Sequence, residues 1–238
     1  MSKKYRTKEE WKTREGVFDN FTRRTLFNLS AKGHFEDIES PIKVGKESQI
    51  FSALKKDGTR LAVKIYRLET ADFNRMYDYI GGDERFVGLK KQRRKIIFAW
   101  VQREYRNLLK FRKAGIRVPL PILFKNNVLL EQFIGDDRAA PQLKDSVPKN
   151  LSRFWKDLHS QLKKMVANNL VHADLSSFNI LNYKEKPVII DLSTSTTKEH
   201  PYYRKYWERD IKNVTTFFNK HGFELDGKKI YKELFSQK

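Results

Sequence analysis

The stretch Leu170–Leu192, LVHADLSSFNILNYKEKPVIIDL, holds three polar residues at fixed spacing among short apolar runs. Asn179 follows Asp174 by five positions, and Asp191 follows Asn179 by twelve, at the end of the apolar run Pro187–Ile190. Transfer of a phosphoryl group from a nucleotide needs such a set, because one carboxylate orients the proton of the nucleophile while an amide oxygen and a second carboxylate hold Mg²⁺. Asp and Asn are also common in turns, so the remainder of the chain must decide between the two interpretations.

The order His-x-Asp-x₄-Asn, followed by a strand that ends in Asp, is typical of the catalytic loop and metal site of protein-kinase-like folds. Such a fold also needs a lysine from a strand. Lys64 lies in the apolar run Leu61–Ile65, where a charge is costly to bury without a partner. The pattern Ala-Val-Lys therefore predicts the lysine that binds the α- and β-phosphates. An edge strand with Lys64 in solvent is the alternative.

Upstream of this lysine, Ile42–Leu54 is predicted as a strand, a tight turn at Gly45 and a second strand, and Lys55–Gly58 as a hairpin turn. A glycine turn between two strands can lay backbone N–H groups over phosphates. A single glycine also fits an ordinary hairpin, so this turn is a candidate phosphate contact only in combination with Lys64.

Downstream, helical periodicity extends over about Lys95–Lys113, with Gly115 as a stop. Glu104 on this helix is the predicted partner of the strand lysine, and a surface pair with a neighbouring arginine is the alternative. Two strands follow, and the second, Val128–Phe133, is predicted to be the hinge between two lobes. Leu151–Ala167 is predicted as a helix that leads into the first stretch.

These elements predict an α+β chain with a bilobal protein-kinase-like fold, made of a β-rich N-terminal lobe and a helical C-terminal lobe. The expected parts are an N-terminal helical segment at residues 1–40, an N-terminal lobe at 41–134 and a C-terminal lobe at 135–238. The helical segment begins with a capping box at Thr7–Glu10. A charged, glycine-interrupted segment at about 68–95 is predicted to be a mobile loop of the N-terminal lobe.

The region after Asp191 is short, because only 47 residues follow it. Ala173 stands before the catalytic-loop aspartate, where protein kinases have an arginine that pairs with a phosphorylated activation loop. His200 is expected to start the last helix. An activation segment and a peptide-binding helical subdomain do not fit in this length, so the substrate-binding region is predicted to be truncated.

Lys and Arg total 49 against 29 Asp and Glu, which gives the 238-residue chain a formal charge of +20. This balance favours a polyanionic partner, either nucleic acid or an anionic membrane surface, and we expect nucleic acid because the basic residues cluster. The chain has no cysteine, no signal-peptide pattern at its start and no apolar run long enough to span a membrane. We therefore expect a cytoplasmic protein that acts away from membranes.

Several longer segments between about residues 41 and 218 carry a family resemblance. They are VGKESQIF, LAVKIYR, ADFNRMYDYIGGDERF, REYRNLLKFRKAGI, VLLEQFIG, LVHADLSSFNIL, PVIIDLS and HPYYRKYWERDIKNVTTFF. Together they resemble the RIO atypical serine/threonine protein kinases, and the compact archaeal members most closely. The combination of HxDLSxxN, IDLS and the final HP…ERD…N…FF is more specific than any one motif.

The resemblance implies a role for each polar residue of the first stretch. Asp174 is the expected catalytic aspartate, and Asn179 and Asp191 are the expected Mg²⁺ ligands. In the family the metal aspartate can also become phosphorylated, which assigns a catalytic role to Asp191 as well. Lys64 is expected to bind phosphates and to pair with Glu104. The implied cofactors are ATP and Mg²⁺, or Mn²⁺ in its place.

The resemblance also implies contacts around the rest of the nucleotide. Ser48, in the glycine-turn segment, is expected to contact phosphates, and the Gln132 carbonyl and the Ile134 amide are expected to hold adenine. Glu131 and Gln132 stand where the family more often has Met and Glu. An ionisable Glu131 is therefore expected near the back of the adenine pocket.

The expected function is that of an Mg-ATP-dependent serine/threonine kinase or ATPase that phosphorylates itself and acts in maturation of the small ribosomal subunit. An ATPase-like switch with residual kinase activity is favoured, since the phosphoryl-transfer groups are present and the platform for a protein substrate is missing. The implied partners are a pre-small-ribosomal-subunit particle, its rRNA and its ribosomal proteins, and the chain is expected to be a monomer. The alternatives are a basic RNA-binding scaffold without turnover and a small-molecule phosphotransferase of the aminoglycoside or choline type.

Overall fold

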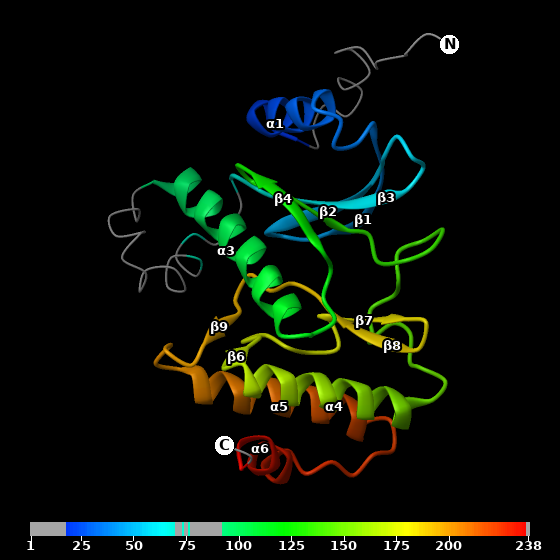
Figure 1. Ribbon diagram of the computed structural model, residues 1–238, viewed down its shortest axis with the longest axis vertical. Coiled ribbons are helices and arrows are strands. Elements are labelled where there is room, and N and C mark those ends of the chain that lie inside the picture. Colours follow the sequence, from blue (N-terminus) through cyan, green and yellow to red (C-terminus); the bar gives the residue numbers. More distant parts are fainter. Residues whose placement is uncertain (1–17, 70–72, 74–75, 77–91, 237–238) are drawn as a thin grey trace.

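The computed structural model describes residues 18–69, 73, 76 and 92–236, and it arranges them in two lobes (Figure 1). The elements of the first lobe are α1 (Asn20–Ala31), β1 (Asp37–Val44), β2 (Ser48–Leu54), β3 (Arg60–Tyr66), α3 (Arg93–Lys113), β4 (Pro121–Lys125) and β5 (Val128–Gln132). Those of the second are α4 (Leu151–Ala167), β6 (Leu170–Val171), β7 (Ile180–Tyr183), β8 (Lys186–Ile189), β9 (Thr196–Thr197), α5 (Tyr203–Asn219) and α6 (Gly227–Phe235). This arrangement agrees with the predicted β-rich first lobe and helical second lobe.

The sheet of the first lobe has the strand order β1-β2-β3-β5-β4, so β3 is an inner strand with antiparallel neighbours on both sides. The β2–β3 connection is the predicted hairpin turn, in which Gly58 has φ +80° and the Lys55 N–H donates to the Thr59 carbonyl at 2.8 Å. Because β3 is not an edge strand, Lys64 does not face solvent, and its side chain is only 4% exposed. The edge-strand alternative for Lys64 is therefore excluded.

The two faces of this sheet have different neighbours, because side chains alternate along a strand. One face packs against α1 in an apolar cluster, to which the strands contribute Phe51, Val63, Ile65, Val128 and Leu130. The opposite face lines a cavity between the lobes and carries Ile50, Ala62, Lys64 and Glu131. The α1 helix therefore backs the sheet and leaves the cavity-facing side open (Figure 1).

The position of α1 is fixed by a cap and by a contact with the sheet. Asp19 caps its N-terminus, because its carboxylate accepts the Phe21 and Thr22 N–H groups, each at 2.9 Å. The Asn127 side chain, in the β4–β5 turn, donates to the Thr22 hydroxyl at 2.8 Å. The helix thus packs on the body of the protein, whereas the capping box predicted at residues 7–10 lies outside the described residues.

The long helix α3 joins the lobes, since it packs against β4 and β5 and also hydrogen-bonds the loop that follows β8. It begins at Arg93, so the predicted loop boundary at about 95 is slightly late. Residues 70–72, 74–75 and 77–91 of that predicted loop lie outside the described residues. The buried face of α3 includes one carboxylate, Glu104, among apolar side chains such as Ile97, Trp100, Val101, Leu108 and Phe111.

The second lobe contains α4 at the predicted Leu151–Ala167, together with α5 and α6. A turn precedes α5, in which the Tyr203 N–H donates to the His200 carbonyl at 2.9 Å. The prediction that His200 starts the last helix is wrong, because α6 follows α5 and packs Ile230 and Leu234 into the same core. Within the described ranges, every helix is too short or too polar to cross a membrane.

Candidate active site

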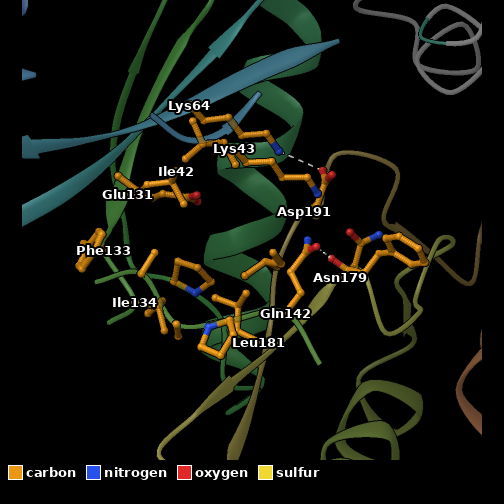
Figure 2. Close-up of a pocket in the computed structure, with 18 of the residues that line it drawn as sticks. Ile42, Lys43, Lys64, Glu131, Phe133, Ile134, Gln142, Asn179, Leu181 and Asp191 are labelled. Atoms are coloured by element: carbon orange, nitrogen blue, oxygen red, sulfur yellow. Dashed lines mark hydrogen bonds and ion pairs between the residues drawn. The ribbon is translucent and has the colours of Figure 1, made fainter. Parts of the chain in front are cut away.

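A cavity of about 570 Å³ lies between the lobes, under the sheet face that carries Lys64 (Figure 2). Strands β1, β2, β3 and β5 form its upper wall, and the segments around β7 and β8 contribute to the wall on the side of the second lobe. The cavity brings together most of the residues predicted for the site, namely Ser48, Lys64, Gln132, Ile134, Asn179 and Asp191. Parts of the chain that are far apart in sequence therefore meet at one cleft.

The amine of Lys64 is contacted by two carboxylates from different elements. Its Nζ lies 2.6 Å from Glu104 Oε1, on α3, and 3.0 Å from Asp191 Oδ1, after β8. Burial lowers the pKa of Lys64, but Asp191 and Glu104 outweigh burial and raise this pKa well above its ordinary value. Lys64 is therefore held as a cation at the edge of the cleft.

Glu104 lies behind Lys64 and not on the surface. Its side chain is 1% exposed, and its carboxylate accepts hydrogen bonds from the Lys64 amine and the Tyr66 hydroxyl. Burial raises the pKa of Glu104, although Lys64 opposes this effect. The neighbouring Arg103 donates to the Ser193 carbonyl at 3.2 Å, so the structure supports the predicted Lys64 partner over the surface pair.

Asp191 follows β8 with φ 62°, in the left-handed region, and its side chain is 42% exposed. Its Oδ1 accepts hydrogen bonds from Lys64 and from the Ser193 hydroxyl, at 3.0 Å each. Burial works to raise the pKa of Asp191, but Lys64, Ser193 and His172 outweigh it and bring the pKa to about 2. The group is therefore a carboxylate, and Oδ2 is the oxygen that can bind a further cation.

Asn179 and Asp174 are linked through the backbone of the catalytic loop. Asn179 Nδ2 donates to the Asp174 carbonyl at 2.9 Å, so the amide oxygen is the atom of Asn179 that remains for a hard cation. The Asp174 side chain lines a separate cavity of about 110 Å³, which it shares with Asp191, Ser193 and Thr194. Asp191 therefore borders both cavities, and Asp174 borders the smaller one.

The donor set fits Mg²⁺ in combination with a nucleotide. Asp191 and Asn179 offer a carboxylate oxygen and an amide oxygen, and Mg²⁺ commonly completes its octahedral shell with water and substrate phosphates. In the part of the chain that the structure describes, no three acidic, histidine or cysteine side chains gather into a metal cluster. Asp191 and Asn179 therefore remain the candidate Mg²⁺ ligands among the described residues of this cleft.

The catalytic loop is anchored by Asp210 on α5, which is the aspartate of the ERD motif but was given no role by sequence analysis. The buried Asp210 carboxylate accepts the Ala173 N–H at 2.8 Å and the Leu175 N–H at 2.9 Å, and Arg209 donates to the Ala173 carbonyl. Burial raises the pKa of Asp210 to about 7 against these two amide bonds, which lower it. The sequence signal for this anchor was a carboxylate three positions after Trp207, on the apolar face of α5, where an acid needs a buried partner.

His172 connects the catalytic loop to the segment around Asp191 through backbone groups. Its Nε2 donates to the Ile190 carbonyl at 2.9 Å, and its own carbonyl accepts the hydroxyls of Thr194 and Ser195. The ring is completely buried, and burial lowers the pKa of His172, which favours the neutral form. This geometry indicates that His172 orients the backbone of the catalytic loop.

The segment after β5 forms the wall predicted to hold adenine. Gln132 ends β5, and its N–H donates to the Leu120 carbonyl at 2.8 Å. The Ile134 carbonyl accepts the Ala140 N–H at 2.8 Å, which folds the following loop back on the hinge. Both Gln132 and Ile134 line the cavity, so the structure places the two predicted base contacts at its side wall.

The β1–β2 turn lines the cavity through Gly45 and Ser48, and Ser48 is the predicted phosphate contact. The Gly45 N–H donates to the Ser48 carbonyl at 2.9 Å, and a Cβ at position 45 would lie 3.0 Å from the same oxygen. Glycine therefore permits the close approach that this turn requires. Figure 2 shows Lys43, another cavity residue that sequence analysis did not single out, extending toward Asp191.

The two lobes, the interlobe cavity and the Lys64–Asp191 contact define a protein-kinase-like domain. The family model described as RIO domain matches residues 49–230. The RIO-type serine/threonine-protein kinase Rio1 of Haloferax volcanii is 35% identical over 225 residues, which cover 94% of this chain and 77% of that protein. Rio1 of Methanocaldococcus jannaschii is 39% identical over 236 residues, which cover 98% of this chain and 80% of that protein.

The chain therefore belongs to the RIO family of serine/threonine-protein kinases, and the predicted family is confirmed. Two solved structures of Rio2 kinase from Chaetomium thermophilum share its fold. The Rio2 kinase–ADP/Mg²⁺–phosphoaspartate complex is 23% identical with a TM-score of 0.70, over 90% of this chain and 65% of that chain. A second Rio2 structure is 22% identical with a TM-score of 0.71, over 93% and 71% of the two chains, which confirms the predicted fold class.

Proposed function

We propose that the protein is an Mg-ATP-dependent RIO-type serine/threonine kinase and ATPase. The observation that carries this proposal is the 3.0 Å contact between Lys64 and Asp191 at the interlobe cavity, with Asn179 in the same wall. The cavity therefore contains the Lys64 amine, which can contact phosphate oxygens, and oxygen atoms of Asp191 and Asn179, which can bind Mg²⁺. The names of the sequence relatives and the ADP and Mg²⁺ in the Rio2 complex support the same chemistry here.

Four residues would bind and orient the nucleotide. The Gln132 carbonyl and the Ile134 amide would hold the base at the hinge, and Ser48 would contact the phosphates near the β1–β2 turn. Lys64 remains protonated beside its carboxylates, so it would neutralise phosphate oxygens. These interactions fix the nucleotide between the lobes, which is most of what phosphoryl transfer requires of a protein.

Three residues would act at the reacting end. Asn179 and Asp191 would hold Mg²⁺, or Mn²⁺ in its place, and the bound ion would neutralise charge on the phosphates. Asp174 would accept the proton of an attacking hydroxyl or orient a water molecule. Its position on the small cavity that Asp191 also borders supports this role.

The short connection between Asp191 and α5 supports turnover on the protein itself over transfer to a peptide substrate. Only the short strand β9 lies between Asp191 and α5, which leaves little room for an activation segment. The acceptor would be a serine of this chain, a serine of a docked partner, or Asp191. In the last case the γ-phosphoryl group moves to the Asp191 carboxylate, ADP leaves, and water hydrolyses the acyl phosphate. We propose this ATPase-like cycle as the main activity, and family membership favours it over a small-molecule phosphotransferase.

Incubation with γ-labelled ATP distinguishes these acceptors. A phosphoryl group on Asp191 is an acyl phosphate, so we expect label that neutral hydroxylamine releases, whereas label on serine survives both hydroxylamine and acid. Asp191→Asn would remove a proposed Mg²⁺ ligand and a proposed phosphoryl acceptor together, so it should abolish labelling whichever acceptor is used. The chemical stability of the label on the wild-type protein therefore decides between Asp191 and serine. A wild-type protein that gains no label and hydrolyses no ATP would contradict the proposed function.

We also propose that the protein acts as a cytoplasmic monomer in maturation of the small ribosomal subunit, with a pre-subunit particle, its rRNA and its ribosomal proteins as partners. The charge of +20 supports a polyanionic partner. Residues Gln92–Lys95, three of which are basic, are exposed at the start of α3. This end of α3 is therefore a candidate RNA contact.

Binding to small-subunit rRNA is expected to weaken steeply with salt, because each Lys or Arg that contacts a phosphate releases a counterion. With about six contacts, the affinity should fall about 10³-fold between roughly 50 and 200 mM salt, as measured by fluorescence anisotropy. Lys95→Glu should reduce the slope of log affinity against log salt by about one. Lys229→Glu, on the exposed side of α6, changes the net charge equally and should leave the slope closer to that of the wild type. Absent or salt-insensitive binding would count against the rRNA proposal.

A further inference from the structure

Glu131 is a buried acid in the wall of the nucleotide cavity, and none of the contacts described above uses it. It is 9% exposed and lies at the end of β5, beside the hinge. Its backbone pairs with Ala62 on β3, so its side chain lies on the same sheet face as Lys64. Figure 2 shows its carboxyl group pointing into the cavity. Among the residues that the structure describes, none hydrogen-bonds to this carboxyl group.

The charges around Glu131 favour its neutral form. Strand β3 contributes Lys64, α3 contributes Glu104, and the segment after β8 contributes Asp191. Lys64 already contacts both of these carboxylates, at 2.6 and 3.0 Å, so its charge is shared before Glu131 is counted. Lys43, from β1, also lines the cavity and extends toward Asp191 (Figure 2). Burial, followed by Glu104, raises the pKa of Glu131 to about 8. At neutral pH the group is a carboxylic acid with one O–H donor and one carbonyl acceptor.

We propose that Glu131 recognises the base of the nucleotide, donating its O–H to N7 of adenine and accepting a hydrogen bond from the N6 amino group. This inference rests on the proposed binding of ATP in the cavity and deepens it to a base specificity. The hinge groups of Gln132 and Ile134 would take the N6 and N1 side of adenine. The N6 and N7 side is then turned toward the inner part of the cavity, where Glu131 lies.

One donor beside one acceptor matches adenine and does not match guanine. Adenine offers an acceptor at N7 and a donor at N6, whereas guanine offers acceptors at both N7 and O6. With guanine, the carbonyl oxygen of the acid would face O6 without a proton between them. An ionised Glu131 would have no donor for N7. The cavity therefore selects adenine as long as Glu131 stays protonated.

The test compares the binding of three nucleotides to the wild-type protein, by calorimetry with Mg²⁺, at pH 7 and pH 9. They are ATP, GTP and 7-deaza-ATP, in which a C–H group replaces N7. At pH 7, ATP should bind about tenfold more tightly than 7-deaza-ATP, because one matched hydrogen-bond pair discriminates bases by about that factor. GTP should bind more weakly still, because guanine also mismatches the hinge groups proposed for the N6 and N1 side. At pH 9, above the pKa of about 8, the affinity for ATP should fall about tenfold while that for 7-deaza-ATP stays level.

Two variants separate hydrogen bonding from ionisation at this position. Glu131→Gln supplies a donor and an acceptor that do not ionise, so it should keep the preference for ATP over 7-deaza-ATP and lose the dependence on pH. Glu131→Leu should lose both the preference and the pH dependence. Glu208→Gln, which removes an exposed carboxylate from α5, is the matched control and should follow the wild type.

Equal binding of ATP and 7-deaza-ATP by the wild type at both pH values would overturn the role of Glu131 and leave the proposed function intact. Failure of the wild type to bind any of the three nucleotides would overturn the proposed function itself. The first comparison uses the natural chain, so its outcome does not depend on whether a variant folds.

Discussion

Replacing Asp174 with asparagine is expected to lower the rate of Mg-ATP turnover by about 10³-fold. The Asp174 carboxylate is proposed to take or orient the proton of the nucleophile, and a positioned general base contributes about 10²- to 10⁴-fold in rate. The loop should keep its shape, because Asn179 donates to the backbone carbonyl of Asp174 and not to its side chain. Release of phosphate from ATP measures the rate, and urea unfolding checks the fold.

The control for this prediction is Asp57→Asn, the same substitution in the exposed β2–β3 turn, which should hydrolyse ATP at the wild-type rate. The competing hypothesis of an RNA-binding scaffold without turnover predicts that Asp174→Ala leaves every measurable property intact. Unchanged ATP hydrolysis by Asp174→Asn would remove the catalytic assignment of this residue.

Replacing Lys64 with methionine should abolish ATP binding and destabilise the fold by about 3 kcal/mol. Methionine nearly matches the length of lysine, but it leaves the carboxyl group of Glu104 buried with the Tyr66 hydroxyl as its remaining partner. Removing one partner of a buried ion pair typically costs about 3–5 kcal/mol, because the other charge stays buried. Urea unfolding followed by tryptophan fluorescence measures the loss.

A second substitution tests whether the buried charge is the cause. Adding Glu104→Gln to Lys64→Met removes that charge and keeps an acceptor for Tyr66, so most of the lost stability should return while ATP binding stays absent. Lys55→Met, in the exposed turn, should change the free energy of unfolding by less than about 0.5 kcal/mol. If Lys64→Met unfolds at the wild-type urea concentration, the ion pair does not stabilise the fold as argued here.

Much of the cleft could be predicted from the sequence, because several of its residues leave a local signal. A lysine inside an apolar strand needs a buried partner, and Glu104 is a carboxylate on the apolar stripe of the next long helix. The spacing of Asp174, Asn179 and Asp191 is set by one loop and one short hairpin, so this set of residues can be recognised without knowledge of the tertiary packing. Helix α4 follows from its periodicity, whereas the hinge strand follows from its apolar run and its place in the order of a kinase-like fold.

Other features depend on packing between distant segments, which leaves no such pattern. Asp210 reaches the backbone of Ala173, 37 positions earlier, only because α5 lies beside the catalytic loop. The sequence shows that Glu131 is ionisable, but its missing partner and its neutral form follow from the sheet register and the crowded carboxylates around Lys64. The helix α6 has nine residues, so its periodicity is too short to predict with its boundaries.

Asp191 borders both the interlobe cavity and the smaller one that contains Asp174. Under the proposed function, the nucleotide would approach this carboxylate from the hinge side, and a water molecule or hydroxyl would approach it through the smaller cavity, which Trp100 of α3 also lines. In the proposed cycle, ADP would leave through the larger cavity, and the water that hydrolyses the acyl phosphate would enter through the smaller one. The lifetime of the phosphorylated protein and that of the nucleotide-bound protein can consequently be set independently, which is what a molecular timer requires.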